Sequence, residues 1–206
     1  MGEIDIFEDL KIIEIRFREI LQCPSLEIRL SREWGAEHST HRQDIRQGIL
    51  NSFPTVVNSH DILNLGQAPI MTPATAGLPH PRFSVSHTTG LGGFAASLQG
   101  SIGFDIEVVA RVTSQIAQRV AIGKELELAP NPAVLWVAKE AIFKGLRPFL
   151  QPTTLSQIET ICWKKVDPLF NTFELHHPKK YGISAGKGCS FCNGLYAIGI
   201  FTEIQN

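Results

Sequence analysis

Apolar residues in the first quarter of the chain recur at helical spacing. In "STHRQDIRQGILNSF", Ile45, Ile49 and Leu50 share one face, and the Ser-Thr pair at its start can cap a helix. The earlier stretch "EDLKIIEIRFREIL" mixes Ile with charged residues, which fits an amphipathic helix or a partly extended segment. Residues 1 to about 55 are therefore predicted to be mostly helical. From Asn58 to Pro81 the chain is rich in Pro, Gly, Ala and Thr, which predicts a loop.

The pattern then changes to short alternating runs. "RFSVSHT", "GGFAASLQ" and "SIGFDIEVV" are separated by Gly-containing turns, and they predict three strands in an antiparallel meander. Helical patterns follow in "TSQIAQRVAI" and in "NPAVLWVAKEAIFKGLRPFL", where Asn131 can cap and Pro132 occupies the first turn. "LSQIETICWKKV", "TFELHH" and "GLYAIGIFTEI" predict further strands.

Two segments resemble each other across the chain. "GGFAASLQG" and "NGLYAIGIFTE" both place a Gly-led run of aromatic residues and Ala after turn residues. With 206 residues, the chain has room for two halves of about 100 residues each. We therefore predict an α+β fold with two similar α/β halves, residues 1–98 and 99–206, each a small, mostly antiparallel sheet packed with helices.

Composition excludes some classes of function. The hydrophobic fraction is 43%, the charged fraction is 19% and the formal net charge is -1, so nothing favours nucleic acid or an anionic membrane as a partner. No run reaches the roughly 18 apolar residues of a membrane span. The acidic N-terminus lacks a basic region followed by an apolar core, so no secretory signal is expected.

Cysteines add little chemistry to this picture. Cys189 and Cys192 form one C-x-x-C, whereas a structural zinc site wants a second such pair. We interpret them as small side chains in or near a strand. Reduced thiols fit a cytoplasmic protein best.

A pair of carboxylates is the first candidate for chemistry. Asp105 and Glu107 are two residues apart in "IGFDIE", so on a strand they project side by side while Phe104 and Ile106 face the core. Adjacent carboxylates repel each other unless a cation lies between them, and oxygen ligands suit Mg²⁺ or Mn²⁺. Two solvated acids on an exposed strand are the simpler alternative.

The helix "LWVAKEAIFKG" carries the second candidate. Trp136, Glu140 and Lys144 lie at i, i+4 and i+8 on one face, where Glu140 can supply a third carboxylate and Lys144 can neutralise charge. Lys139 is about 100° around the helix from Glu140 and is predicted to border the same cleft. The alternative is an exposed Glu–Lys pair worth about 0.3–0.5 kcal/mol.

"SVSHT" carries the third candidate. The Ser86 hydroxyl and the His87 imidazole can donate hydrogen bonds to a phosphate. Neighbouring residues on a strand point to opposite faces, which makes the two a poor nucleophile–base pair. A histidine that simply belongs to the core is the alternative for His87.

Together these stretches resemble the 4′-phosphopantetheinyl transferase superfamily. The family signature is a G-hydrophobic-D-x-E strand followed by a W-x-x-K-E-x-x-x-K helix, with a Ser-His pair upstream. The resemblance covers roughly residues 83 to 145, and the chain length is similar to the monomeric, surfactin-synthetase-activating type. The matching signature residues are Gly103, Asp105, Glu107, Trp136, Lys139, Glu140 and Lys144.

The resemblance implies a fold and a reaction. The fold would be the pseudo-duplicated one of that family, with nucleotide contacts in residues 1–98 and the metal site and catalytic helix in residues 99–206. The enzyme would be a cytoplasmic monomer that moves 4′-phosphopantetheine from coenzyme A to a serine of an acyl or peptidyl carrier protein and releases 3′,5′-ADP.

The resemblance also implies roles for the signature residues. Mg²⁺ (or Mn²⁺) would be held by Asp105, Glu107 and Glu140 beside the coenzyme A diphosphate. Glu140 would also help deprotonate the carrier serine. Lys144 would stabilise charge on the transferring phosphoryl group or protonate the leaving group, and Lys139 would lie near coenzyme A.

The N-terminal half matches the family less closely. Ser86, His87 and Arg42 would hold the nucleotide end of coenzyme A. Where the family tends to carry Gly-Lys/Arg-Pro, this chain has "GQAP" (Gly66 to Pro69) without a cation, and Arg82 is the candidate to replace it. Two alternatives stay open: a coenzyme A or nucleotide-binding module without transfer, and a metal-dependent phosphohydrolase.

Overall fold

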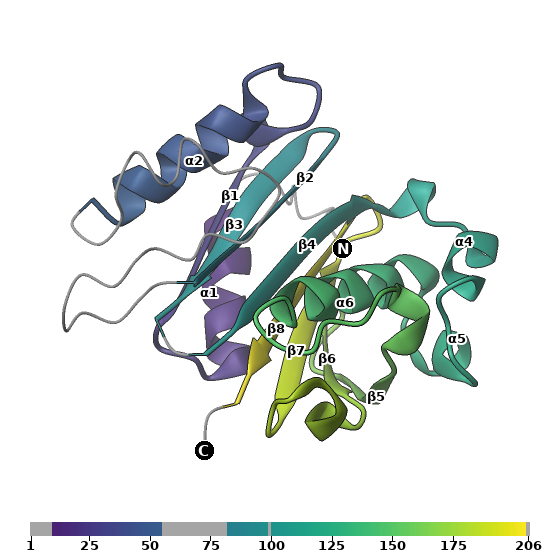
Figure 1. Ribbon diagram of the computed structural model, residues 1–206. Helices are drawn as coiled ribbons and strands as arrows, with labels where there is room; N and C mark the ends of the chain where they lie inside the picture. Colours follow the sequence, from purple (N-terminus) through teal and green to yellow (C-terminus); the bar gives the residue numbers. More distant parts are fainter. Residues whose placement is uncertain (1–9, 55–81, 99, 205–206) are drawn as a thin grey trace.

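The computed structural model describes residues 10–54, 82–98 and 100–204, and it has an α+β architecture with two antiparallel sheets (Figure 1). The first sheet has the strand order β1-β3-β2, and the second has the order β4-β8-β7-β6-β5. The strands are β1 (Leu26–Ser31), β2 (Arg82–Thr88), β3 (Leu91–Ser97), β4 (Ile102–Val108), β5 (Thr160–Lys165), β6 (Phe170–Leu175), β7 (Gly186–Cys192) and β8 (Tyr196–Glu203).

Helices pack around these sheets. Among the described residues, none of the helices is both long and apolar enough to cross a bilayer. The α-helices are α1 (Leu10–Leu21), α2 (His41–Ser52), α4 (Ser114–Gln118), α5 (Glu125–Leu128) and α6 (Pro132–Gly145). The short 3₁₀ helices are η1 (Arg32–Trp34), η2 (Val109–Arg111), η3 (Leu155–Gln157) and η4 (Pro178–Tyr181).

The predicted meander is correct for two of its three strands. β2 and β3 pair as an antiparallel hairpin, but β4 leaves that sheet and pairs with β8. The prediction missed β1 because the first 55 residues were interpreted as mostly helical, although "LEIRLS" buries every second residue as a strand does. The interpretation of Cys189 and Cys192 as small side chains in or near a strand is confirmed, because both lie in β7, where Cys189 is buried and Cys192 accepts a hydrogen bond from Asn131.

Side-chain hydroxyls of β2 join the two sheets along β4. Ser84 Oγ accepts from the backbone N–H of Phe104 (2.9 Å), and Ser86 Oγ accepts from that of Ile106 (3.2 Å). Residue numbers rise together on both strands, so β2 and β4 run parallel without a backbone ladder. We call this junction of Ser84, Ser86 and Thr88 with β4 the β2–β4 seam. It satisfies amide groups that would otherwise be unpaired on the edge of the five-stranded sheet.

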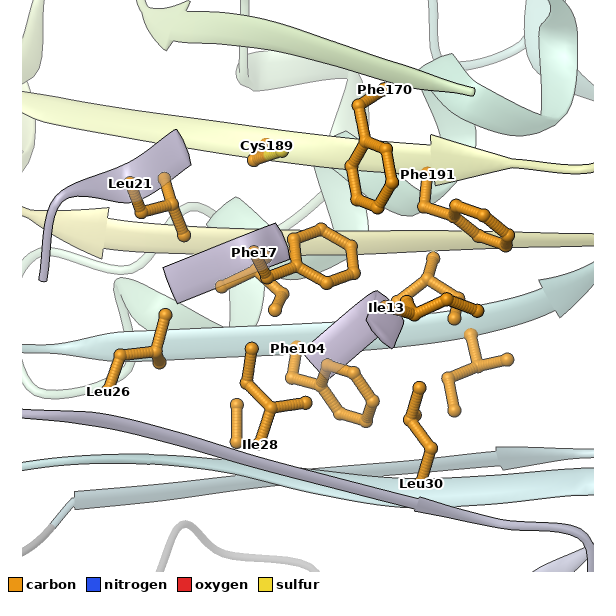
Figure 2. Packing of buried hydrophobic residues seen from close by; sticks show 14 of the residues in the cluster. Ile13, Phe17, Leu21, Leu26, Ile28, Leu30, Phe104, Phe170, Cys189 and Phe191 are labelled. Atoms are coloured by element: carbon orange, nitrogen blue, oxygen red, sulfur yellow. The ribbon is translucent and has the colours of Figure 1, made fainter. Parts of the chain in front are cut away.

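One hydrophobic cluster spans both sheets. Helix α1 contributes Ile13, Phe17 and Leu21, which pack against β1 and against strands of the second sheet (Figure 2). The Phe17 and Phe170 rings meet edge to face, with centroids 5.3 Å apart. The division into residues 1–98 and 99–206 stays a prediction: it falls between β3 and β4, yet α1 packs on both sides of it.

Helix α6 covers the opposite face of the second sheet from α1. As predicted, Asn131 caps it: its Oδ1 accepts from Val134 N at 2.9 Å, and Pro132 occupies the first turn. On β4, Phe104 and Ile106 join the core with α1, so Gly103, Asp105 and Glu107 face α6. A Cβ atom at Gly103 would overlap the carbonyl oxygen of Ala141. Glycine at this position therefore lets the helix lie directly on the strand that carries the carboxylates.

Substituting this glycine is expected to push α6 away from β4. We predict that Gly103→Ala lowers the free energy of unfolding by about 1–3 kcal/mol, the usual cost of overpacking, and weakens the Lys144–Asp105 contact. Urea unfolding measures the loss. Gly123→Asn is the control, because a Cβ atom there meets nothing within 4 Å and Asn tolerates its positive φ of 54°. Equal stability of Gly103→Ala and wild type would contradict the close packing.

Candidate functional site

Asp105 and Glu107 lie side by side on the α6 face of β4, as their spacing predicted. Asp105 is opposite Gly199 and Glu107 is opposite Ala197 on β8, and these small residues let the backbone of α6 lie close to the sheet, since a Cβ atom at Gly199 would be 2.5 Å from the carbonyl oxygen of Val137. Asp105 is 7% exposed, and Glu107 is partly buried. The simpler alternative of two fully solvated acids does not describe this pair.

Lys144 from α6 reaches over the β2–β4 seam to Asp105. Its Nζ lies 2.7 Å from Asp105 Oδ1 and donates to the carbonyl oxygens of Phe104 (3.0 Å) and Val85 (3.4 Å). The ammonium group thus contacts both sheets and neutralises one carboxylate. This agrees with the predicted placement of Lys144 beside the carboxylates of β4.

Glu140 is one turn before Lys144 and faces the same region. Burial raises the pKa of its carboxyl group above the ordinary value, and the negative charge of Asp105 raises it further. Lys144 and Arg147 oppose these effects without cancelling them. Within the described ranges, no hydrogen bond reaches the Glu140 carboxylate. The site therefore holds a partly buried acid whose pKa lies above the ordinary value.

The carboxylates of Asp105, Glu107 and Glu140 are not arranged as a complete set of metal ligands in this structure. In the part of the chain that the structure describes, no three His, Cys, Asp or Glu side chains are grouped closely enough to hold an ion. Asp105 binds Lys144, while Glu107 Oε1 lies 3.4 Å from Arg111 Nη1. The amine of Lys144 and the guanidinium group of Arg111 thus meet the negative charge of Asp105 and Glu107, and the three-ligand metal site stays a prediction.

The donor set nevertheless fits a hard divalent cation. All three groups are carboxylates, which Mg²⁺ and Mn²⁺ prefer. The negative charges of Asp105 and Glu107 both raise the pKa of Glu140, so the three side chains interact electrostatically. A cation there would remove the repulsion that raises the Glu140 pKa.

Ser86 and His87 point to opposite sides of β2, as predicted. Ser86 Oγ donates its proton to Asp105 Oδ1 at 2.8 Å, so the hydroxyl has no second proton for a phosphate. The predicted role of Ser86 as a phosphate donor therefore does not fit this arrangement. Because Ser86 donates to Asp105 and points away from His87, Ser86 and His87 do not form a nucleophile–base pair.

His87 faces the start of α2. Its Nε2 lies 3.2 Å from Nε2 of His41, whose Nδ1 is 2.6 Å from the His38 carbonyl oxygen. Burial lowers the pKa of His87, and the positive charges of His41, Arg42 and Lys144 lower it further. Arg42 is close enough to His87 for its charge to act on the imidazole, and the contact of both residues with coenzyme A stays a prediction. The structure also places His41 there, which the sequence analysis had not selected.

Lys139 contradicts its predicted place at the cleft. It is fully buried and forms an ion pair with Glu125 (2.6 Å). Its Nζ also donates to the carbonyl oxygens of Val120 and Ile158. Glu125 Oε1 accepts in turn from the backbone and the hydroxyl of Thr160, both at 2.6 Å. Lys139 is therefore a structural link between α6, α5 and β5, and it is not available to coenzyme A.

Sequence reasoning also missed two polar neighbours of Glu107. Thr88 Oγ1 donates to Glu107 Oε1 at 3.0 Å, and Arg111 Nη1 donates to the same hydroxyl at 3.3 Å. The regular alternation of Ser84, Ser86 and Thr88 was the signal for a polar face of β2. The "GQAP" segment, Gly66 to Pro69, lies outside the described residues, and Arg82 lies 5.9 Å from the Phe149 ring centroid.

Comparison of the chain with protein-family models gives no match, and a search of curated proteins finds no similar sequence. A functional assignment for this chain depends on its own residues and their arrangement.

Proposed function

We propose that this protein is a 4′-phosphopantetheinyl transferase of the monomeric, surfactin-synthetase-activating type, with the pseudo-duplicated fold of that family. The observation that carries the proposal is the meeting of three separate stretches at one place. β2 provides Ser86 and Thr88, β4 provides Asp105 and Glu107, and α6 provides Lys144 beside them. These are the stretches on which the resemblance rests.

The proposed reaction forms one bond and breaks one. The hydroxyl oxygen of the carrier serine attacks the phosphorus that bears the pantetheine arm, and the bond from that phosphorus to the bridging diphosphate oxygen breaks. The products are the phosphopantetheinylated carrier and 3′,5′-ADP. Transfer of this kind depends on positioning and on charge neutralisation rather than on covalent catalysis by the protein.

The chain's own residues suit these tasks. Glu140 accepts the serine proton, directly or through a water. Lys144 provides positive charge beside the reacting phosphoryl group. Asp105, Glu107 and Glu140 would hold Mg²⁺ (or Mn²⁺), which would supply Lewis-acid stabilisation of the diphosphate when bound. Arg42 and His87 would hold the nucleotide end of coenzyme A.

The partner follows from the reaction. The substrate protein is an acyl or peptidyl carrier with acidic residues around its serine, and the proposed location is the cytoplasm. No role for nucleic acid or a membrane is proposed.

Mass spectrometry of an apo carrier protein tests the proposal. The full chain is incubated with the carrier, coenzyme A and Mg²⁺, and we expect the carrier to gain the mass of one phosphopantetheine. A Ser→Ala carrier is the control. Hydrolysis of coenzyme A without modification of any carrier would favour a phosphohydrolase instead. A rise of the thermal midpoint with coenzyme A, but no product, would favour a binding module.

A further inference from the structure

Two hydroxyl groups of the β2–β4 seam donate hydrogen bonds to the two carboxylates of β4. Ser86 Oγ donates to Asp105 Oδ1 at 2.8 Å, and Thr88 Oγ1 donates to Glu107 Oε1 at 3.0 Å. Both hydroxyl-bearing residues are buried, Ser86 at 8% and Thr88 at 2% exposure. They come from the first sheet, whereas the carboxylates belong to the second.

Each of these bonds holds one carboxylate oxygen and leaves the other. Asp105 Oδ1 accepts hydrogen bonds from Ser86 and Lys144. Glu107 Oε1 accepts hydrogen bonds from Thr88 and from the backbone N–H of Val108, and it forms an ion pair with Arg111 at 3.4 Å. In residues 10–54, 82–98 and 100–204, no hydrogen bond reaches Asp105 Oδ2 or Glu107 Oε2. Each carboxylate therefore presents one oxygen in a defined orientation.

We infer that Ser86 and Thr88 are positioning residues for a divalent cation, which they orient Asp105 and Glu107 to receive without touching it. The inference rests on the proposed function. Two carboxylates at i and i+2 repel each other and would turn apart if nothing restrained them. A hydrogen bond to one oxygen of each prevents that rotation and aims the second oxygen. Partners of this kind usually change metal affinity by about 10–100-fold when they are removed.

The β2–β4 seam would then also affect the binding of the cation. A separation of the two sheets at β2 and β4 would release both carboxylates at once. Cation affinity of the second sheet therefore depends on residues of the first.

The chain offers a matched control for this inference. Ser84 is 8% exposed like Ser86 and accepts a backbone N–H of β4 in the same way, but it touches no carboxylate. Ser84→Ala and Ser86→Ala thus remove the same kind of seam contact, and only the second releases a carboxylate. Thr88→Val removes the hydroxyl while keeping the shape, and Thr88→Ser restores it.

Binding of Mn²⁺ to the full chain is the measurement, followed through the free-ion signal in electron paramagnetic resonance. We expect Ser86→Ala and Thr88→Val each to weaken Mn²⁺ binding by about 10–100-fold. Ser84→Ala and Thr88→Ser should bind within about threefold of wild type. Thermal midpoints of all variants, recorded without metal, separate loss of folding from loss of binding.

Two outcomes in the variants would overturn the inference. One is an equal loss of Mn²⁺ affinity in Ser84→Ala and Ser86→Ala, since the effect would then belong to the seam in general. The other is unchanged affinity in Ser86→Ala and Thr88→Val. The carrier assay on wild type, run in parallel, distinguishes these from failure of the proposed function. A wild-type protein that transfers the arm but binds no Mn²⁺ would also refute the positioning role.

Discussion

Glu140→Gln is expected to abolish transfer of the phosphopantetheine arm while leaving the fold intact. The change removes both a proposed cation ligand and the proposed acceptor of the serine proton. General-base catalysis alone contributes about 10²–10⁴-fold, so the rate should fall by at least that factor. The rate is measured as the gain of mass on an apo carrier, and circular dichroism checks the fold.

The same substitution should stabilise the metal-free protein. Burial and the charge of Asp105 raise the pKa of Glu140, so its ionised form opposes folding at neutral pH. Glutamine has nearly the same shape without the charge. We expect the thermal midpoint to rise by about 2–4 °C, which corresponds to about 1 kcal/mol in a chain of this size.

This effect has a defined dependence on pH. A raised folded-state pKa means that the folded protein binds more protons than the unfolded chain above pH 4.5, the ordinary value for a glutamate. The contribution of Glu140 to stability is therefore complete below pH 4.5 and is lost as pH rises through its folded pKa. The advantage of Glu140→Gln should accordingly appear near neutral pH and vanish in acid.

Glu127→Gln provides the control for loss of charge. Glu127 is an exposed residue of α5, so its substitution should change neither transfer nor stability noticeably. Transfer by Glu140→Gln at the wild-type rate would remove Glu140 from the proposed mechanism. A lower midpoint in the metal-free variant would mean that Glu140 stabilises the site in a way that the geometry does not explain.

Lys139→Met is expected to cause the largest loss of stability. Lys139 and Glu125 are 0% and 2% exposed in their side chains, so removal of the amine leaves a buried carboxylate without its counter-ion. Breaking one side of such a pair costs about 3–5 kcal/mol. Two carbonyl oxygens, of Val120 and Ile158, lose their donor as well. Urea unfolding should show the loss as a lower midpoint concentration.

The double variant Lys139→Met/Glu125→Gln tests the cause of that loss. Glutamine keeps one acceptor oxygen for Thr160, loses the one that accepts from Ile122 N, and carries no charge, so part of the stability should return. Lys124→Met, at an exposed position, should stay within about 0.5 kcal/mol of wild type. If Lys139→Met lowers the free energy of unfolding by less than about 1 kcal/mol, Glu125 must reach water in the variant through local unfolding, and the prediction would be wrong.

Local pattern predicted the elements that carry the site. The alternation in "IGFDIE" placed Phe104 in the core and Asp105 on the other face, because side chains of a strand alternate. The spacing of Glu140 and Lys144 placed them on one side of a capped helix that the structure confirms. These regularities depend only on residues a few positions apart, so the sequence alone was sufficient.

Partners that are distant in the sequence could not be predicted in the same way. Lys139 and Glu140 are neighbours in the chain, but the helix turns one toward Glu125 and the other toward Asp105. Nothing local distinguishes a lysine that borders a cleft from one that is buried with a glutamate. The pairing of β4 with β8, almost one hundred residues later, was invisible for the same reason.

The amino-acid sequence by itself determined an α+β chain, the strand with two carboxylates, the helix with Glu140 and Lys144, and the resemblance that suggests a transferase. Only the tertiary structure decided which hydroxyl holds which carboxylate, that Lys144 spans the β2–β4 seam, and that Lys139 is structural. The physical reason is that periodicity records which face a residue occupies, whereas the group it meets there depends on how separate elements pack.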